Sequence, residues 1–284
     1  MEWVKPAGVR AGTQGGWRDD FPLTHDLPGA ITLDFSAVEL PIHPMLLVRV
    51  AVFCDWHRRL GAQVQLVPPV DRAAGALLSA MFPSGPDPLD AATAVQLEID
   101  PEHVVLPVTR LKGHLDVELV ADRTRQILEY ERPDVAPLGS AVFMAVSELC
   151  GNGVDHGRNE FGTYIAVQRV LAPRRQISVA VADLGMGIPE HVRQRYPEWS
   201  DDGYAIANAM EPRVTGTGDE HRGNGYTETF EAALTSTLHA ARLDVHAANG
   251  FVRTELVDGR RKVDVIPAPR FRRGTWISYD IVSA

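Results

Sequence analysis

The sequence has few cysteines and no long hydrophobic run. Its two cysteines, Cys54 and Cys150, lie in apolar surroundings, and neither belongs to a CxxC pair, which excludes a disulfide framework and a cysteine metal site. The longest apolar run, Pro44–Phe53, is interrupted by Arg49 and is too short to span a bilayer. The N-terminus also lacks a charged and then apolar signal pattern. We therefore expect a cytoplasmic protein in a reducing setting, with no membrane partner.

Basic residues are scarce as well. The 28 lysines and arginines, almost all of them arginine, are outnumbered by 37 acidic residues, so the net charge is −9. The pairs Arg174–Arg175 and Arg272–Arg273 do not form a basic stripe, and we interpret them as parts of a solvated face. Because a phosphate backbone requires a concentrated positive surface, nucleic acid is excluded as a partner.

The 284 residues, of which 45% are hydrophobic, suffice for two ordinary cores. Residues 1–28 are rich in Gly and Pro without a period, which predicts an irregular N-terminal arm. Residues 29–88 predict a βαβα unit, whose short connections imply parallel strands. Its expected elements are a strand at 31–35, a helix at 44–60, a strand at 64–67 and a helix at 72–81 that Asp71 caps.

A second α/β unit is predicted after a linker at 89–104, and it covers residues 105–284. Amphipathic patterns indicate two helices, and alternating patterns indicate a set of strands. The helices are expected at 115–130 and 138–156, and the strands at 104–108, 164–167, 177–182, 243–246, 253–256 and 275–281. Helices on one face of a mixed sheet form an α/β sandwich, so the predicted fold class is α/β throughout.

The most informative motif lies on the second of these helices. Glu148, Asn152 and His156 recur every four residues in the stretch SELCGNGVDH, so they share one stripe of the helix. An amide oxygen suits Mg²⁺, which is usually held by one or two protein groups and phosphate oxygens. A carboxylate one turn earlier can hold a water or hydroxyl for attack on a γ-phosphate. The alternative is a polar helix face in solvent.

Two glycines interrupt the same helix. Gly151 and Gly153 each disfavour a helix by ~1 kcal/mol relative to Ala, so their presence predicts close packing. Either a bound nucleotide or a neighbouring strand could be the packing partner. His156 also has two interpretations, since it either faces phosphates or is stabilised by the dipole at the helix C-terminus.

A glycine turn follows the apolar strand that ends at Asp183. A carboxylate in this position can accept a hydrogen bond from the exocyclic amine of adenine, whereas guanine has a carbonyl there. Gly185 and Gly187, which precede Ile188, let the backbone pass close to a flat base. The alternative is a plain β-turn before a helix that starts at Pro189.

Residues 190–222 form a long polar segment, which predicts a mobile loop with a short helix at 202–210. The run Arg222–Tyr226 then opens a helix expected to reach His239, and free N–H groups at a helix start bind phosphates well. Because no Gly-Lys-Ser/Thr is present, this run is not a Walker loop.

These blocks, followed by Gly274 and Thr275, occur in an order that resembles the GHKL superfamily of histidine kinase-like ATPases. That superfamily includes type II topoisomerases, heat-shock chaperone ATPases, histidine-kinase catalytic domains and MutL, with the related anti-sigma-factor kinases. The resemblance implies a Bergerat-type α/β sandwich that binds ATP and Mg²⁺. It also implies that Asn152 ligates Mg²⁺, that Glu148 is the general base and that Asp183 binds adenine.

The resemblance further makes 190–222 an ATP lid, and it makes the Thr275 hydroxyl a support for Asp183 through water. One mild departure is Tyr226, where the family usually has Leu. The nucleotide-binding residues that the resemblance implies are Asn152, Asp155, His156, Asp183, Gly185, Gly187, Ile188, Arg222, Gly223, Asn224, Gly225, Tyr226 and Thr275.

The front residues 29–88 resemble a STAS domain, the fold of the anti-sigma-factor antagonists. The resemblance rests on Leu33–Glu39, the long helix that follows and the strand end Leu66–Pro68. Where that family has an acidic residue, a phosphorylatable serine pair and a glycine, this chain has Pro41–Pro44, which includes no hydroxyl. We therefore expect a structural or partner-binding role for this unit.

Two classes of function follow from these expectations. The first is a slow ATPase or serine/threonine protein kinase of the anti-sigma-factor kinase type that regulates a protein partner. The second is a non-catalytic, ATP-dependent conformational switch, and a homo-oligomer is compatible with both. A histidine kinase is disfavoured because a βαβα unit precedes the ATP domain, instead of a dimerising helical pair with a phosphoacceptor histidine. The acidic charge disfavours a topoisomerase or MutL role.

Overall fold

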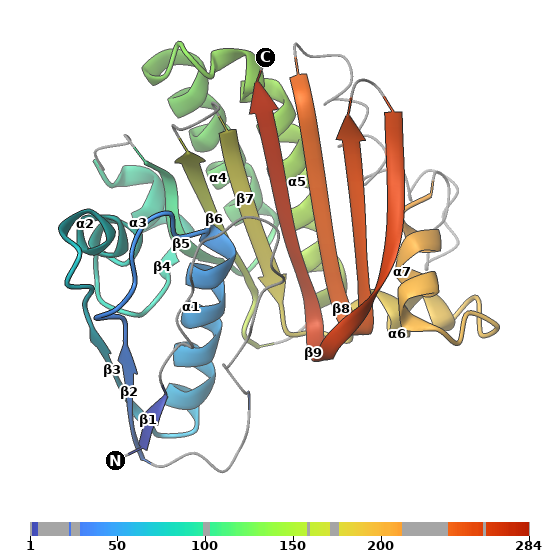
Figure 1. Cartoon of the computed structure of the whole chain (residues 1–284), viewed down its shortest axis with the longest axis horizontal. Coiled ribbons are helices and arrows are strands. Elements are labelled where there is room, and N and C mark those ends of the chain that lie inside the picture. The colour runs from blue at the N-terminus through green and yellow to red at the C-terminus, as the bar shows by residue number, and fades with distance from the viewer. Residues whose placement is uncertain are drawn as a thin grey trace.

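The computed structural model describes residues 2–4, 23, 29–98, 103–157, 160–170, 176–211, 238–257 and 260–283. The fold is mixed α/β, with one three-stranded sheet and one six-stranded sheet. Figure 1 shows three layers: a front unit, the large sheet, and a pair of helices behind that sheet. Across the described ranges, no helix combines the length and the apolarity that a membrane span needs.

The front unit has the predicted βαβα order. Its elements are β2 (Ala30–Asp34), α1 (Pro44–Arg59), β3 (Gln63–Val67) and α2 (Arg72–Met81). The strands β2 and β3 pair in parallel, as expected from the short connections. Local signals set the helix ends: His43 and Asp71 accept hydrogen bonds from the backbone N–H groups of Met45 and Ala74, and α1 ends just before Gly61, whose φ is +88°.

The expectation of an irregular arm is wrong for Glu2–Val4. These residues form β1, which pairs in parallel with β2 and completes the three-stranded sheet. β1 pairs with the free edge of β2, which lies about 29 residues later in the chain. A local sequence pattern cannot predict such a distant partner. We use the name front unit for β1, β2, β3, α1 and α2.

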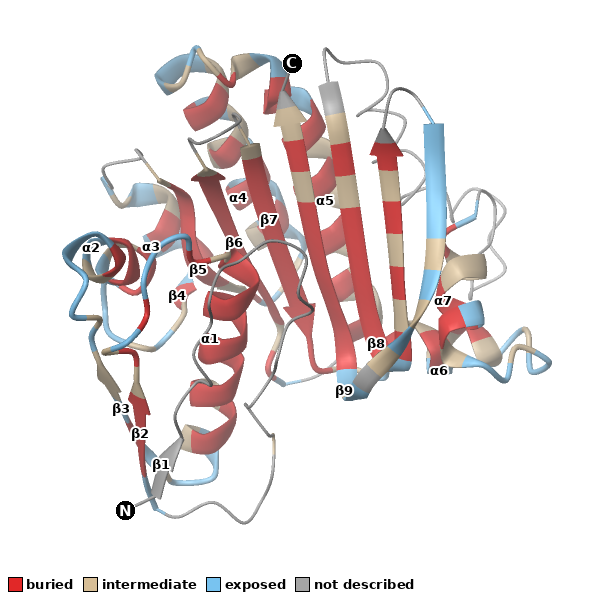
Figure 2. Cartoon of the chain, viewed as in Figure 1, coloured by how far each residue is buried: buried red, intermediate tan, exposed pale blue. Residues whose placement is uncertain are grey.

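Helix α1 is almost entirely buried, with 13 of its 16 residues inaccessible. A helix that is apolar all round needs partners on every side. One side packs on the front unit, and the other packs on β6 and β7 of the large sheet, where Tyr164, Ala166, Ala180 and Ala182 join the same apolar cluster. Figure 2 shows this continuous buried layer. The predicted domain boundary at 88 stays a prediction, but the two units share a core.

The large sheet has the strand order β4-β5-β6-β7-β9-β8, in which only β4 and β5 are parallel. The strands are β4 (Leu89–Asp90), β5 (Val104–Leu111), β6 (Thr163–Val170), β7 (Gln176–Asp183), β8 (Leu238–Val257) and β9 (Arg260–Ser283). The helices are α3 (Ala91–Gln96), α4 (His114–Gln126) with a π-helical turn (Ile127–Glu131), a 3₁₀ turn (Ala136–Leu138), α5 (Gly139–Gly157), α6 (Gly187–Arg193) and α7 (Asp202–Ala209). The expected strands and the helices α4 and α5 are all found.

Three differences from the sequence expectation concern this sheet. Residues 89–104, expected to be a linker, include β4 and α3, because β4 pairs with β5 and extends the sheet. The strands expected at 243–246, 253–256 and 275–281 are parts of β8 and β9, two long strands that bend and continue (Figure 1). The helix expected from Tyr226 to His239 lies outside the described residues, except for its last two positions, which belong to β8.

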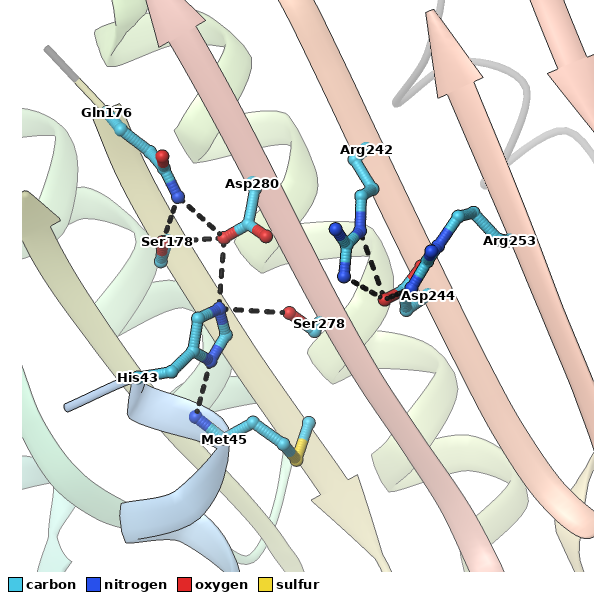
Figure 3. Close-up of polar contacts among 9 residues, drawn as sticks. All are labelled: His43, Met45, Gln176, Ser178, Arg242, Asp244, Arg253, Ser278 and Asp280. Carbon is cyan, nitrogen blue, oxygen red and sulfur yellow. Dashed lines mark hydrogen bonds and ion pairs between the residues drawn. The ribbon is translucent and has the colours of Figure 1, made fainter. Parts of the chain in front are cut away.

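Polar contacts fasten the front unit to the large sheet at two places. At the start of α1, His43 Nε2 lies 3.1 Å from Asp280 Oδ1 on β9, and the Ser178 hydroxyl donates to the same oxygen at 2.6 Å (Figure 3). Near the end of α1, Asp55 accepts hydrogen bonds from Arg110 of β5 and from the Tyr164 hydroxyl of β6. The first contact lies beside the start of β7, and the second lies closer to its end.

Candidate functional site

The motif helix α5 lies on the rear face of the large sheet. Its apolar residues, among them Ala141, Val142, Ala145, Val146, Leu149 and Cys150, are buried against the strands. Glu148, Asn152 and His156 are half-buried along the border of that apolar face, as their period of four predicts. Among the described residues, the Asn152 side chain has no hydrogen-bond partner, so its amide oxygen is available to a ligand.

The two glycines of α5 have different roles. A Cβ at Gly153 would lie 2.7 Å from the side chain of Thr163 on β6, so this glycine allows the helix to approach a neighbouring strand. Among the residues that the structure describes, a Cβ at Gly151 would meet nothing within 4 Å. Of the two packing partners considered, the strand accounts for Gly153. Gly151 instead leaves an open surface beside Asn152.

Asp183 ends β7 with a buried carboxylate that is only 6% exposed. Its Oδ1 accepts a hydrogen bond from the Gly185 N–H at 2.8 Å, and Thr275 is its partner on β9. Burial raises the pKa of Asp183 to about 6, although hydrogen bonds from Gly185 and from the hydroxyl and backbone of Thr275 oppose the rise. The carboxylate is therefore ionised at neutral pH and is held in one orientation.

The residues 183–188, named here the Asp183 turn, pack closely against α5 and β9. A Cβ at Gly185 would collide with the backbone of Gly157, the last residue of α5. Gly187 adopts a φ of +79°, and its missing Cβ would lie 3.0 Å from the carbonyl oxygen of Gly274. Gly274 also has a positive φ, and a side chain there would collide with the Asp183 carbonyl group. Three sequence blocks, at 148–157, 183–188 and 274–275, thus meet at one place.

Other predicted site residues have protein partners. Asp155 Oδ1 lies 2.9 Å from His114 Nε2 on α4, a contact that provides a structural role. The His156 ring lies 4.2 Å from the His191 ring of α6, centre to centre. His156 is also the penultimate residue of α5, as the alternative of a histidine at the helix C-terminus requires. Ile188 is partly buried and packs against the apolar core of the large sheet. Nucleotide contacts by these three residues stay a prediction.

The segment predicted as a mobile lid includes the end of α6 and all of α7 in its described part, residues 190–211. Ala205 and Ile206 of α7 are buried, as is Met210 just after it, and the helix packs on β8. Asp202 accepts from Arg193 at 2.5 Å and from the backbone N–H of Asn249 at 2.9 Å. The expected helix at 202–210 is confirmed, and its apolar residues reach the core. The predicted mobility of the segment stays a prediction. Residues 212–222, and the predicted phosphate loop with Arg222, Gly223, Asn224, Gly225 and Tyr226, lie outside the described residues.

The expectation of a solvated face is incomplete for the pair Arg272–Arg273. Burial lowers the pKa of Arg272 to about 10. Arg273 is exposed, yet its Nε donates to the carbonyl oxygen of Leu184 at 3.3 Å, and its guanidinium carbon lies 5.2 Å from the centre of the Trp56 ring. The sequence offered one signal for this role, the position of Arg273 directly before the Gly274–Thr275 block.

No protein-family model and no curated protein matches the chain. Two solved structures that resemble it are the 43K ATPase domain of gyrase B from Thermus thermophilus, in complex with an aminocoumarin, and the ATP-binding domain of topoisomerase IV from Francisella tularensis, in complex with a small-molecule inhibitor. The first is 18% identical with a TM-score of 0.26 over 54% of this chain, and the second is 16% identical with a TM-score of 0.21 over 38%. The chain spans 39% and 47% of their respective lengths. What the site binds is therefore inferred from its own residues.

Proposed function

We propose that the chain binds ATP with Mg²⁺ where the C-terminal half of α5 meets the Asp183 turn. The observation that carries this proposal is the convergence of the blocks 148–157, 183–188 and 274–275 around a buried carboxylate. A fixed, ionised acceptor beside an open helix face suits a flat ligand that donates a hydrogen bond from an amine.

Asp183 is proposed to recognise the base. Its ionised carboxylate would accept a hydrogen bond from the exocyclic amine of adenine, and guanine would place a carbonyl there instead. The carboxylate already accepts from Gly185, and Thr275 also hydrogen-bonds to it, so little reorganisation is needed when a ligand arrives. The glycines of the turn leave the backbone bare where a base would lie.

Asn152 and Glu148 are proposed to act on the phosphate side. Asn152 would offer its amide oxygen to Mg²⁺ without adding negative charge beside a triphosphate. The bound metal would neutralise charge on the phosphates. Glu148 lies one turn earlier on the same border of α5, where it would hold the water or hydroxyl that attacks the γ-phosphate. The open surface at Gly151 lies on the turn of helix between them.

The activity we propose is that of a slow ATPase or a serine/threonine protein kinase that acts on a protein partner. The alternative is a non-catalytic switch, in which ATP alters a protein interface with little turnover. The front unit is proposed as the element that contacts the partner, since position 43, where a STAS-like unit would have a phosphorylatable residue, is a histidine fastened to Asp280.

Binding is tested by calorimetry with ATP and with GTP in the presence of Mg²⁺. We expect ATP to bind more tightly, and Asp183→Asn to weaken ATP binding by ~1–3 kcal/mol, the cost of a mispaired buried polar group. Equal affinities for ATP and GTP would remove Asp183 from its proposed role.

Catalysis is tested with γ-labelled ATP, with and without lysate proteins. Asn152→Ala should weaken Mg²⁺-dependent binding, whereas Glu148→Gln should preserve binding and lower turnover by ~10²–10⁴-fold, the usual contribution of a general base. Asn208→Ala on α7 is the matched control, because it makes the same change at a residue that is not among the proposed nucleotide contacts. If Glu148→Gln abolished binding as fully as Asn152→Ala, Glu148 would be structural. Binding without hydrolysis or transfer by the wild type would favour the switch.

A further inference from the structure

The front unit packs directly against the Asp183 turn. Leu184, the residue after Asp183, is completely buried in the apolar cluster that includes α1. The backbone of Leu184 is held from the same direction, because its carbonyl oxygen accepts the Arg273 Nε–H at 3.3 Å. The carbonyl of Arg273 in turn accepts from the Trp276 indole N–H at 2.8 Å. The side chain of Leu184 is thus held by the apolar cluster of α1, and its backbone is held by Arg273 of β9.

Four side chains form a stacked column beside this contact. In order they are Arg273, Trp56, Phe161 and Arg59, which we name the aromatic column. The Arg273 guanidinium carbon lies 5.2 Å from the Trp56 ring centre, Trp56 stacks on Phe161 at 5.2 Å with an interplanar angle of 19°, and Arg59 lies 4.3 Å from the Phe161 ring centre. The two rings are 6% and 7% exposed, so they are held in the core, while the arginines cap them at the surface.

The aromatic column connects α1 to both segments that carry the candidate site. Phe161 lies in the connection that leaves α5 at Gly157, and Arg273 holds the turn that leaves β7 at Asp183. These two connections touch each other where Gly185 packs on Gly157. Trp56, on α1, therefore contacts Phe161 of one connection and also Arg273, which hydrogen-bonds to Leu184 of the other.

Helix α1 contacts both β6 and β7, and its length is similar to that of β7. A helix of 16 residues is about 24 Å long, close to the roughly 27 Å of an eight-residue strand. Its first end is fixed by His43 to Asp280 near the start of β7, as Figure 3 shows. One residue before Trp56, Asp55 accepts a hydrogen bond from Tyr164, which pairs with Ala182 close to the end of β7. A rotation or shift of α1 about the His43 end would therefore move the support of the Asp183 turn.

We propose that Trp56 and Arg273 are positioning residues through which the front unit braces the Asp183 turn and sets nucleotide affinity. The effect on nucleotide affinity rests on the proposed function, whereas the support of the Asp183 turn by the front unit does not. Because coupling between two sites is reciprocal, a partner that shifts α1 changes ATP affinity, and ATP changes the affinity for that partner by the same factor.

The test compares Arg273→Met with Arg59→Met. Each substitution keeps an aliphatic stem and removes a guanidinium from one end of the aromatic column, but only Arg273 contacts the Asp183 turn. Three quantities are measured for each variant: the melting temperature of the free protein, the Kd values for ATP and GTP, and the hydrogen exchange of the amides at 184–187. Arg273→Lys tests rescue, since a lysine can keep a charge over Trp56 and one donor for Leu184.

We expect Arg273→Met to weaken ATP binding by about 3–10-fold, the factor for one lost hydrogen bond with a cation–π contact. The preference for ATP over GTP should shrink, because Asp183 is less well oriented, and exchange at 184–187 should accelerate. Arg59→Met should lower the melting temperature by a similar amount, while ATP affinity stays within about twofold and exchange at 184–187 is unchanged. Arg273→Lys should restore most of the ATP affinity.

Two results would overturn the proposal. One is equal behaviour of Arg273→Met and Arg59→Met in nucleotide affinity and in local exchange, since Arg273 would then only stabilise the fold. The other is a loss of ATP affinity in Arg273→Met without faster exchange at 184–187, since the turn would then not be what Arg273 holds. If the wild type bound no ATP, the proposed function would fail, and the exchange comparison alone would decide whether the front unit braces the turn.

Discussion

Asp183 gives the most specific prediction about stability and pH. Burial raises its pKa from 3.8 to about 6, and the hydrogen bonds from Gly185 and Thr275 offset only part of that effect. The native state therefore holds a proton that the unfolded state releases about two pH units earlier. Each pKa unit corresponds to about 1.4 kcal/mol, so the ionised carboxylate destabilises the native state by about 3 kcal/mol at neutral pH.

The sign of the pH dependence follows directly. Between about pH 4 and pH 6 the native state binds more protons than the unfolded state, so the contribution of Asp183 to stability falls as pH rises. Asp183→Asn removes this titration. The stability of the variant relative to the wild type should therefore rise by about 2–3 kcal/mol between pH 4 and pH 7. The hydrogen bonds that the substitution removes are missing at pH 4 and at pH 7 alike, so their effect on stability cancels in this comparison.

Urea unfolding of both proteins at pH 4, 5, 6 and 7 measures the effect. The m-values should agree, so that only the midpoints differ, and the other carboxylates titrate alike in both proteins. A midpoint difference that is constant across this range would refute the reasoning, because Asp183 would then titrate as it does in the unfolded chain.

The same carboxylate should link nucleotide binding to protons. A donor on the adenine base favours the ionised form, so ATP should lower the pKa of Asp183 and bind less tightly as pH falls below about 6. Calorimetry at pH 6 in two buffers of different ionisation enthalpy should detect proton release on binding. Identical heats in the two buffers would contradict a direct contact between the base and Asp183.

Three further predictions concern other parts of the structure. Gly151→Ala should stabilise the free protein by up to ~1 kcal/mol in thermal unfolding, because a Cβ there meets no described residue within 4 Å. It should weaken ATP binding if ligand covers that surface, and a destabilised variant would show that the surface is not open. Asp202→Ala removes the ion pair with Arg193, so limited proteolysis should cut faster at 194–211. The free energy of global unfolding should change by less than ~1 kcal/mol. Unchanged cleavage would mean that α7 is held by its apolar contacts alone. Asp55→Ala should lower the free energy of unfolding in urea by ~1–3 kcal/mol, because the Tyr164 hydroxyl loses its acceptor between the front unit and the large sheet. No change would show that apolar contacts suffice there.

Much of the local structure could be predicted from the sequence. The ends of α2 follow from Asp71, whose carboxylate caps the helix, and the ends of α1 follow from Pro44 and Gly61. The period of four in α5 predicted that Glu148 and Asn152 share one border of the helix. Such signals are readable because a cap or a helix face depends on residues within about four positions of one another.

The sequence alone determined that this chain is an α/β protein with a motif helix, a strand ending on an acidic residue and a glycine turn. Only the tertiary structure decided that α1 packs against both sheets and that Arg273 hydrogen-bonds to Leu184. It also decided that Gly153 lets α5 approach a strand, whereas no described residue would contact a Cβ at Gly151. These features join residues that are far apart in the chain, such as positions 55 and 164 or 184 and 273. Their partners are chosen by packing in three dimensions, which brings distant segments together in a way that no local pattern encodes.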